Sequence, residues 1–113
     1  MKYDLEERTA KFSEDAISLC KKVPQDTISK PVLSQLIRSA TSIGANYMEA
    51  NGASSKKDFK YKIFICKKEC RETKYWLRLL AKTNEIFSQT CRILWKEAQE
   101  LTLIFSKIAL NTK

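Results

Sequence analysis

Three ionisable side chains on an otherwise apolar helical face are the residues of this sequence best placed to do acid–base chemistry. At 100° per residue, Asp58, Lys62 and Glu69 fall within the arc that is predicted to point inward. The apolar and hydroxyl members of that arc are Phe59, Ile65, Cys66, Thr73, Trp76, Leu77 and Leu80. An enzyme built on Glu69, Glu72 and Lys62 would need a pocket converging on those side chains. The chain has no histidine, no HExxH or DxD metal spacing and no glycine-rich phosphate loop. We therefore expect no catalytic residue, no metal and no cofactor.

A polar network that fixes helix register or assembly geometry explains Asp58, Lys62 and Glu69 better than a catalytic site does. Asp58 and Lys62 are four residues apart and can pair along a helix. A buried Glu69 carboxylate needs a partner, because an unpaired buried charge is costly. Arg38, or a polar seam on the preceding helix, could supply that partner. The predicted network comprises Arg38, Ser42, Asn46, Glu49, Asp58, Lys62 and Glu69.

Positive charge is concentrated in one segment. Residues 54–82 hold ten basic and three acidic residues, so they account for +7 of the net charge of +8. Seven of these cations lie within about 40° of one line on a helical wheel, a set that we call the basic ridge. The basic ridge consists of Lys56, Lys60, Lys67, Arg71, Lys74, Arg78 and Lys82, and Phe64 occupies its one gap.

A continuous line of cations matches the phosphates of a nucleic acid. At 1.5 Å per residue the basic ridge spans about 39 Å, roughly one turn of a duplex. Such a surface would bind mainly by counterion release, without reading bases. No aromatic stacking platform is evident, so we expect structured RNA to be recognised by shape and phosphate contacts. A solvated helix face is the alternative explanation, and an anionic membrane surface is disfavoured because no bulky apolar face is left for insertion.

Four cysteines could in principle hold a disulfide or a metal. Cys20, Cys66, Cys70 and Cys91 each fall in a helical pattern on or beside an apolar face, and no CxxC motif occurs. We predict small buried thiols in a reducing compartment. A metal site built on Cys66 and Cys70 is the less favoured alternative.

The remaining pattern predicts an all-α domain spanning residues 1–113. Two glycines and two prolines leave little material for turns. Helices are expected from Asp4 to Val23, from Val32 to Ala50 with Pro31 in the first turn, from a Ser55 cap to Lys82, and from Gln89 to Leu110. Short connections predict an antiparallel up-down-up-down four-helix bundle. No apolar run could span a membrane and the first residues lack a hydrophobic signal region, so we expect a cytoplasmic protein.

The expected helix from Val32 to Ala50 has an unusual lack of charge. Its nineteen residues include only two formal charges, Arg38 and Glu49. A helix that faces water normally carries a charged stripe. We therefore expect a second copy of the chain to cover part of this helix.

Two segments carry a resemblance to a known family. QLIRSATSIGANYMEA and SSKKDFKYKIFICKKECRETKYWLRLL, with a weaker match in YDLEERTAKF and LCKKVP, resemble the four-helix bundle proteins encoded in bacterial 23S rRNA intervening sequences. The resemblance implies an antiparallel four-helix protomer that assembles into a homopentamer without enzyme activity. A similar basic pentameric protein acts with the reverse transcriptase of diversity-generating retroelements and binds nucleic acid, which implies the same partners here by analogy only.

These observations favour a non-enzymatic homo-oligomer that binds RNA or DNA through the basic ridge with little sequence specificity. The alternative is a structural or protein-interaction module with no nucleic-acid role, in which the ridge meets an acidic surface or keeps the protein soluble.

Overall fold

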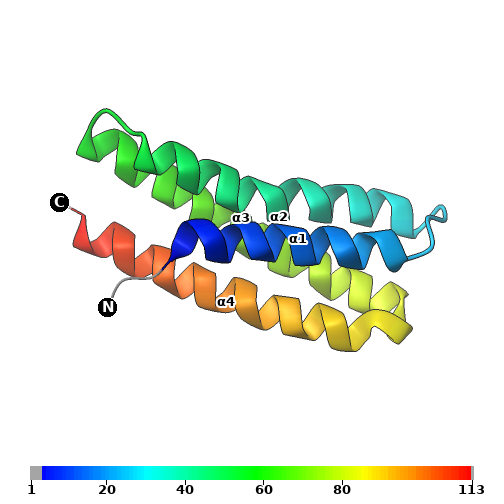
Figure 1. Ribbon diagram of the computed structural model, residues 1–113. Coiled ribbons are helices and arrows are strands. Elements are labelled where there is room, and N and C mark those ends of the chain that lie inside the picture. Colours follow the sequence, from blue (N-terminus) through cyan, green and yellow to red (C-terminus); the bar gives the residue numbers. More distant parts are fainter. Residues whose placement is uncertain (1–3, 113) are drawn as a thin grey trace.

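Four long helices make up the fold, as Figure 1 shows. The computed structural model describes residues 4–112. The elements are α1 (Leu5–Lys22), α2 (Ser29–Asn51), α3 (Lys56–Thr83), the short 3₁₀ turn η1 (Glu85–Phe87) and α4 (Ser88–Asn111). Successive helices run antiparallel along a molecule of 45 × 24 × 19 Å. The predicted all-α four-helix bundle is therefore confirmed.

The helix boundaries follow local capping chemistry. The Asp4 side chain accepts from Glu7 N (3.2 Å) at the start of α1, and Ser55 accepts from Asp58 N (3.0 Å) at the start of α3. The second helix begins at Ser29, three residues before the predicted Val32. It starts earlier because Asp26 accepts from both Ile28 N and Ser29 N, which satisfies donors that a helix N-terminus leaves free.

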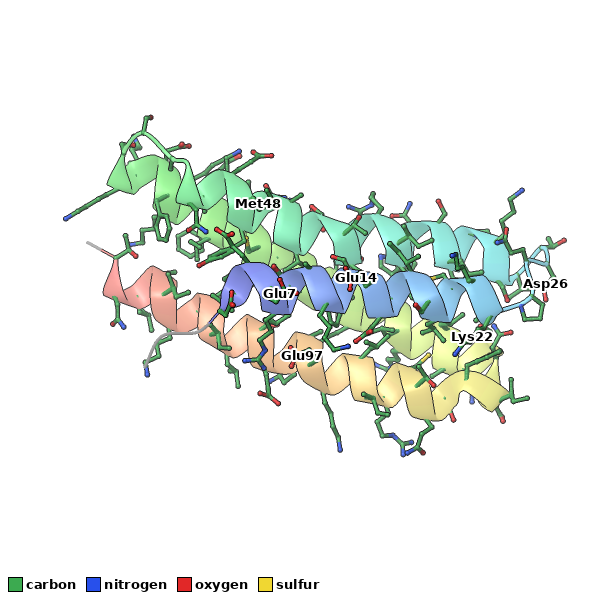
Figure 2. All side chains as sticks on the ribbon, in the orientation of Figure 1. Glu7, Glu14, Lys22, Asp26, Met48 and Glu97 are labelled. Carbon is green, nitrogen blue, oxygen red and sulfur yellow. The ribbon has the colours of Figure 1, made fainter. Side chains whose placement is uncertain are left out.

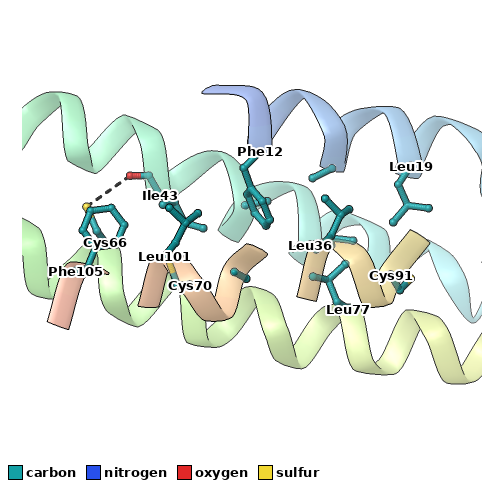
Figure 3. Close-up of a cluster of buried hydrophobic side chains, with 14 of the residues drawn as sticks. Phe12, Leu19, Leu36, Ile43, Cys66, Cys70, Leu77, Cys91, Leu101 and Phe105 are labelled. Carbon is teal, nitrogen blue, oxygen red and sulfur yellow. Dashed lines mark hydrogen bonds between the residues drawn. The ribbon is translucent and has the colours of Figure 1, made fainter. Parts of the chain in front are cut away.

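Helix α3 is the centre of the arrangement. It packs along both α2 and α4, whereas α1 packs mainly along α2 and touches α4 less. Figure 3 shows the core between the helices, with Phe12 from α1, Leu36 and Ile43 from α2, and Phe105 from α4. All four are at most 2% exposed. None of the described helices is long and apolar enough to cross a membrane.

The inward face of α3 differs from the predicted one. The buried residues of α3 are Ile63, Cys66, Glu69, Cys70, Thr73, Leu77 and Leu80, whereas Phe59, Ile65 and Trp76 are only half-buried. The buried face is thus rotated toward α4, because α3 must fill the angle between two neighbouring helices rather than lie against α2 alone. The rotation also changes which residues of α3 face water.

All four cysteines are free and buried, as predicted for small core thiols. The Cys66 thiol donates to the Ile43 carbonyl oxygen (3.5 Å), the contact drawn in Figure 3. Burial raises the pKa of Cys66 to about 12 and the pKa values of Cys20 and Cys91 to about 11. Across residues 4–112, no group of three or more potential ligand side chains is placed to hold a metal ion.

These thiols predict a loss of stability at alkaline pH. The folded chain keeps their protons at a pH where the unfolded chain, with thiol pKa values near 9.0, releases them. Stability is therefore full below about pH 9 and falls as pH rises through 11, by up to about 1.4 kcal/mol per pH unit for each thiol. Urea unfolding between pH 8 and pH 11 measures this slope. The Cys20→Ala/Cys91→Ala variant should show a shallower slope, and a slope equal to that of the wild type would contradict the assignment.

Candidate nucleic-acid interface

The basic ridge lies along one side of α3 and is exposed to different degrees. Lys56, Arg71, Arg78 and Lys82 are exposed, whereas Lys60, Lys67 and Lys74 are half-buried. The difference follows from the rotation of α3, which turns the second group toward α4. The structure thus keeps the seven cations on one helix but divides them into an outward set and a set beside α4.

Lys74 shows how the second set is held. Its ammonium group donates to the Gln99 side-chain oxygen and lies 5.2 Å from the centroid of the Trp95 ring on α4. A cation over an indole face is attracted by the ring quadrupole. Both partners are neutral, so they position the charge of Lys74 without cancelling it.

Unlike four other cations of the described chain, those of the basic ridge have no carboxylate partners. Within residues 4–112, the ion pairs use Arg8, Lys11, Arg38 and Lys62, and none of them uses a ridge residue. Arg8 of α1, for comparison, is held by Glu97 (2.7 Å) and Glu100 (3.0 Å) of α4. Figure 2 shows Glu7 and Glu14 of α1 and Glu97 of α4 on the side of the bundle where α1 lies. The positive charge of the basic ridge is left for mobile counterions or a ligand.

A second line of side chains on α3 points fully outward and was missed by the sequence analysis. It follows alternating spacings of four and three residues, all of its members are exposed, and we call it the outer stripe. Its members are Lys57, Tyr61, Phe64, Lys68, Arg71, Tyr75, Arg78 and Lys82. Three of the eight are aromatic, so this face exposes rings that the sequence analysis did not place there. The spacing was visible in the sequence, but nothing in the sequence alone identified this line as the outermost one.

One further cation comes from another helix. Arg92 of α4 is exposed and lines, together with Arg78 and Trp95, a groove between α3 and α4. Sequence reasoning missed Arg92 because residue 92 is 14 positions away from Arg78 and only the packing of α4 on α3 brings the two together.

The polar network centres on Arg38. Its guanidinium pairs with Glu69 (Nη1 to Oε1, 3.4 Å) and with Glu72, and its Nε donates to Gln35 (2.9 Å). Glu69 is only 7% exposed, so Arg38 supplies the charged partner that a buried carboxylate requires. Glu72 also accepts from the Trp76 indole N–H (3.0 Å). The network therefore links α2 to α3.

The other predicted members of the network are arranged differently from expectation. Lys62 pairs with Glu49 of α2 (2.8 Å) rather than with Asp58, and this bond is the main cause of the raised pKa of Lys62. The α2–α3 packing places Glu49 within reach of Lys62, so an interhelical pair replaces the local one. Asn46 donates to Ser42 one turn earlier (2.9 Å), so this contact lies within α2.

A buried contact outside the prediction completes the α2–α3 interface. The Thr73 hydroxyl donates to Ser39 Oγ (2.9 Å), and both residues are fully buried.

Comparison with known proteins identifies the family. The model of the family described as 23S rRNA-intervening sequence protein matches residues 1–107. The chain belongs to this family. A crystal structure of a protein of unknown function from the S23 ribosomal protein family of Bacteroides thetaiotaomicron VPI-5482 is similar at 31% identity and a TM-score of 0.82, covering 92% of this chain and 96% of that one. No curated protein matches at a significant level. The family resemblance found in the sequence is thus confirmed, and the solved structure just described is itself of a protein of unknown function.

Proposed function

We propose that this protein is a non-enzymatic homo-oligomer that binds RNA or DNA through α3 with little sequence specificity. The observation that carries the proposal is the line of α3 cations that have no carboxylate partners among the described residues. Unpaired cations on a rigid helix would exchange their counterions for phosphates, and that exchange supplies most of non-specific nucleic-acid affinity.

The polar network supports a structural rather than a catalytic role for the buried carboxylates. Glu69 and Glu72 both contact Arg38 at the α2–α3 interface, whereas Lys62 pairs with Glu49. A general acid or base has to reach a substrate proton. Carboxylates that are bonded to an arginine between two helices are better suited to fixing how those helices pack.

Self-assembly is supported by the outward face of α2. Five residues at helical spacing along that face are uncharged and at most half-buried: Ser34, Ile37, Thr41, Ala45 and Met48. Met48, labelled in Figure 2, is 67% exposed. A second copy of the chain would remove this weakly polar surface from water, and the family resemblance implies five copies. Light scattering of the purified protein counts them, and a mass equal to one protomer would contradict assembly.

The salt dependence of binding tests the nucleic-acid proposal. With four to seven phosphates contacted, log Kobs for a duplex should fall against log[salt] with a slope of about −4 to −6. Fluorescence anisotropy of a labelled oligonucleotide between 50 and 200 mM NaCl measures the slope. Absence of binding at 50 mM NaCl would favour a module that binds only protein partners.

A further inference from the structure

We propose that the ligand of α3 is a single-stranded nucleic acid, whose unpaired bases stack on the aromatic rings of the outer stripe. This inference rests on the proposed function and names its ligand class. It follows from the exposed rings that lie among the cations of the outer stripe, because phosphate binding alone does not need exposed rings.

The exposure of the three rings is the first observation. Tyr61, Phe64 and Tyr75 are 61%, 49% and 53% exposed, and they occupy one face of one helix. Aromatic side chains usually bury large areas, and contiguous exposed apolar surface marks an interaction site. The rings are flanked by cations on the same face, so the surface fits a ligand that is both flat and negatively charged.

Tyr75 is held in place by its surroundings. Its ring meets the Trp76 ring edge-on at a centroid distance of 5.1 Å. Trp76 is fixed in turn by its hydrogen bond to Glu72, which pairs with Arg38. The network thus connects the α2–α3 interface to Tyr75, which remains about half exposed. A ring that is already immobilised loses little conformational entropy when a base stacks on it.

Phe64 lies beside three cations. A shallow surface hollow is lined by Phe64, Lys67, Lys68, Arg71 and Glu72. A base against the Phe64 ring would therefore have three cations nearby for its phosphates. Stacking beside a positively charged track is how proteins bind single strands without sequence preference.

The exposed rings favour an open strand over a duplex. At 1.5 Å per residue, Tyr61 and Phe64 are about 4.5 Å apart along the helix and Phe64 and Tyr75 about 17 Å apart. Bases in a duplex are stacked on one another and present only edges and phosphates to a protein surface. A duplex would meet the cations but leave the three rings unused, whereas an unpaired strand uses both.

The test compares one sequence in single-stranded, duplex and abasic forms. Anisotropy titrations use a labelled RNA 15-mer, the same strand annealed to its complement, and an abasic strand of equal length. The wild type should bind the single strand most tightly. Phe64→Ala and Tyr75→Ala should each weaken that binding by roughly tenfold, with the salt slope unchanged. Affinity for the abasic strand should not change.

Three controls separate stacking from other effects. Tyr61→Phe/Tyr75→Phe keeps the rings and should retain binding. Leu103→Ala removes a side chain of similar exposure (59%) from α4 and should have no effect. Sedimentation of Phe64→Ala and Tyr75→Ala should show an unchanged oligomer.

Each other outcome overturns the inference in a distinguishable way. Stacking is ruled out if the alanine variants lose as much affinity for the abasic strand as for the single strand. It is also ruled out if they lose no affinity for the single strand. If the wild type binds the duplex more tightly than the single strand, the ligand class is wrong but the proposed function still holds. If it binds none of the three probes, both the ligand class and the proposed function are wrong. Dissociation of the oligomer in the alanine variants would assign the rings to an interface between copies of the chain.

Discussion

Reversing four outward charges on α3 is expected to abolish nucleic-acid binding while the helical fold remains. The variant replaces Lys57, Lys68, Arg71 and Arg78 by Glu. All four side chains are exposed and form no ion pair within the described part of the chain, so little packing is lost. Lys74 is left unchanged because its contacts with Trp95 and Gln99 join α3 to α4. Anisotropy titration in 100 mM NaCl should show an affinity loss of more than about 100-fold, since attraction is replaced by repulsion along the line.

A matched control separates local charge from net charge. The variant Lys22→Glu/Lys30→Glu/Lys96→Glu/Lys107→Glu changes the net charge by the same eight units through exposed residues of α1, α2 and α4. It should lose much less affinity, because its substitutions lie off α3. Circular dichroism should give both variants the helical content of the wild type. Equal losses in the two variants would show that only overall charge attracts the ligand, and unchanged binding in the α3 variant would refute the interface.

Removing Arg38 should have the largest effect on stability among single polar substitutions. The Arg38→Met variant keeps the apolar part of the side chain but leaves Glu69 buried and Glu72 without its charged partner. Breaking a buried pair typically costs 3–5 kcal/mol, and we expect about 2–3 kcal/mol here because the Arg38 side chain is 46% exposed. Urea unfolding monitored by circular dichroism measures the change in free energy.

A double variant identifies the cause. Without Arg38, the buried Glu69 carboxylate has lost its charged partner, and an unpaired buried charge is costly. Arg38→Met/Glu69→Leu removes that charge and should therefore recover part of the stability that Arg38→Met loses at pH 7. A double variant that is no more stable than Arg38→Met would argue against an uncompensated carboxylate.

Much of the local structure was determined by short-range chemistry that the sequence displays. Ser55 followed by Asp58 predicted the cap of α3, and the caps and 3.6-residue patterns predicted four helices with connections too short for anything but antiparallel neighbours. The segments from Gln35 to Ala50 and from Ser54 to Leu80 also carried enough of the family pattern to identify it. These features depend on residues that are close in the chain, so no tertiary information was needed. The start of α2 was misplaced because the side chain of Asp26, three residues before Ser29, caps the helix.

The tertiary structure alone decided which way each face of α3 points. Periodicity fixes the angles between side chains on a helix but not the direction of the whole set, which depends on the neighbours that pack against it. Because α3 lies between α2 and α4, Lys67 and Lys74 turn toward α4 and Tyr61, Phe64 and Tyr75 turn toward water. The same packing gave Lys62 an interhelical partner in place of Asp58. The sequence by itself determined that α3 is the charged helix, and only the assembled bundle determined that its outermost line combines cations with exposed rings.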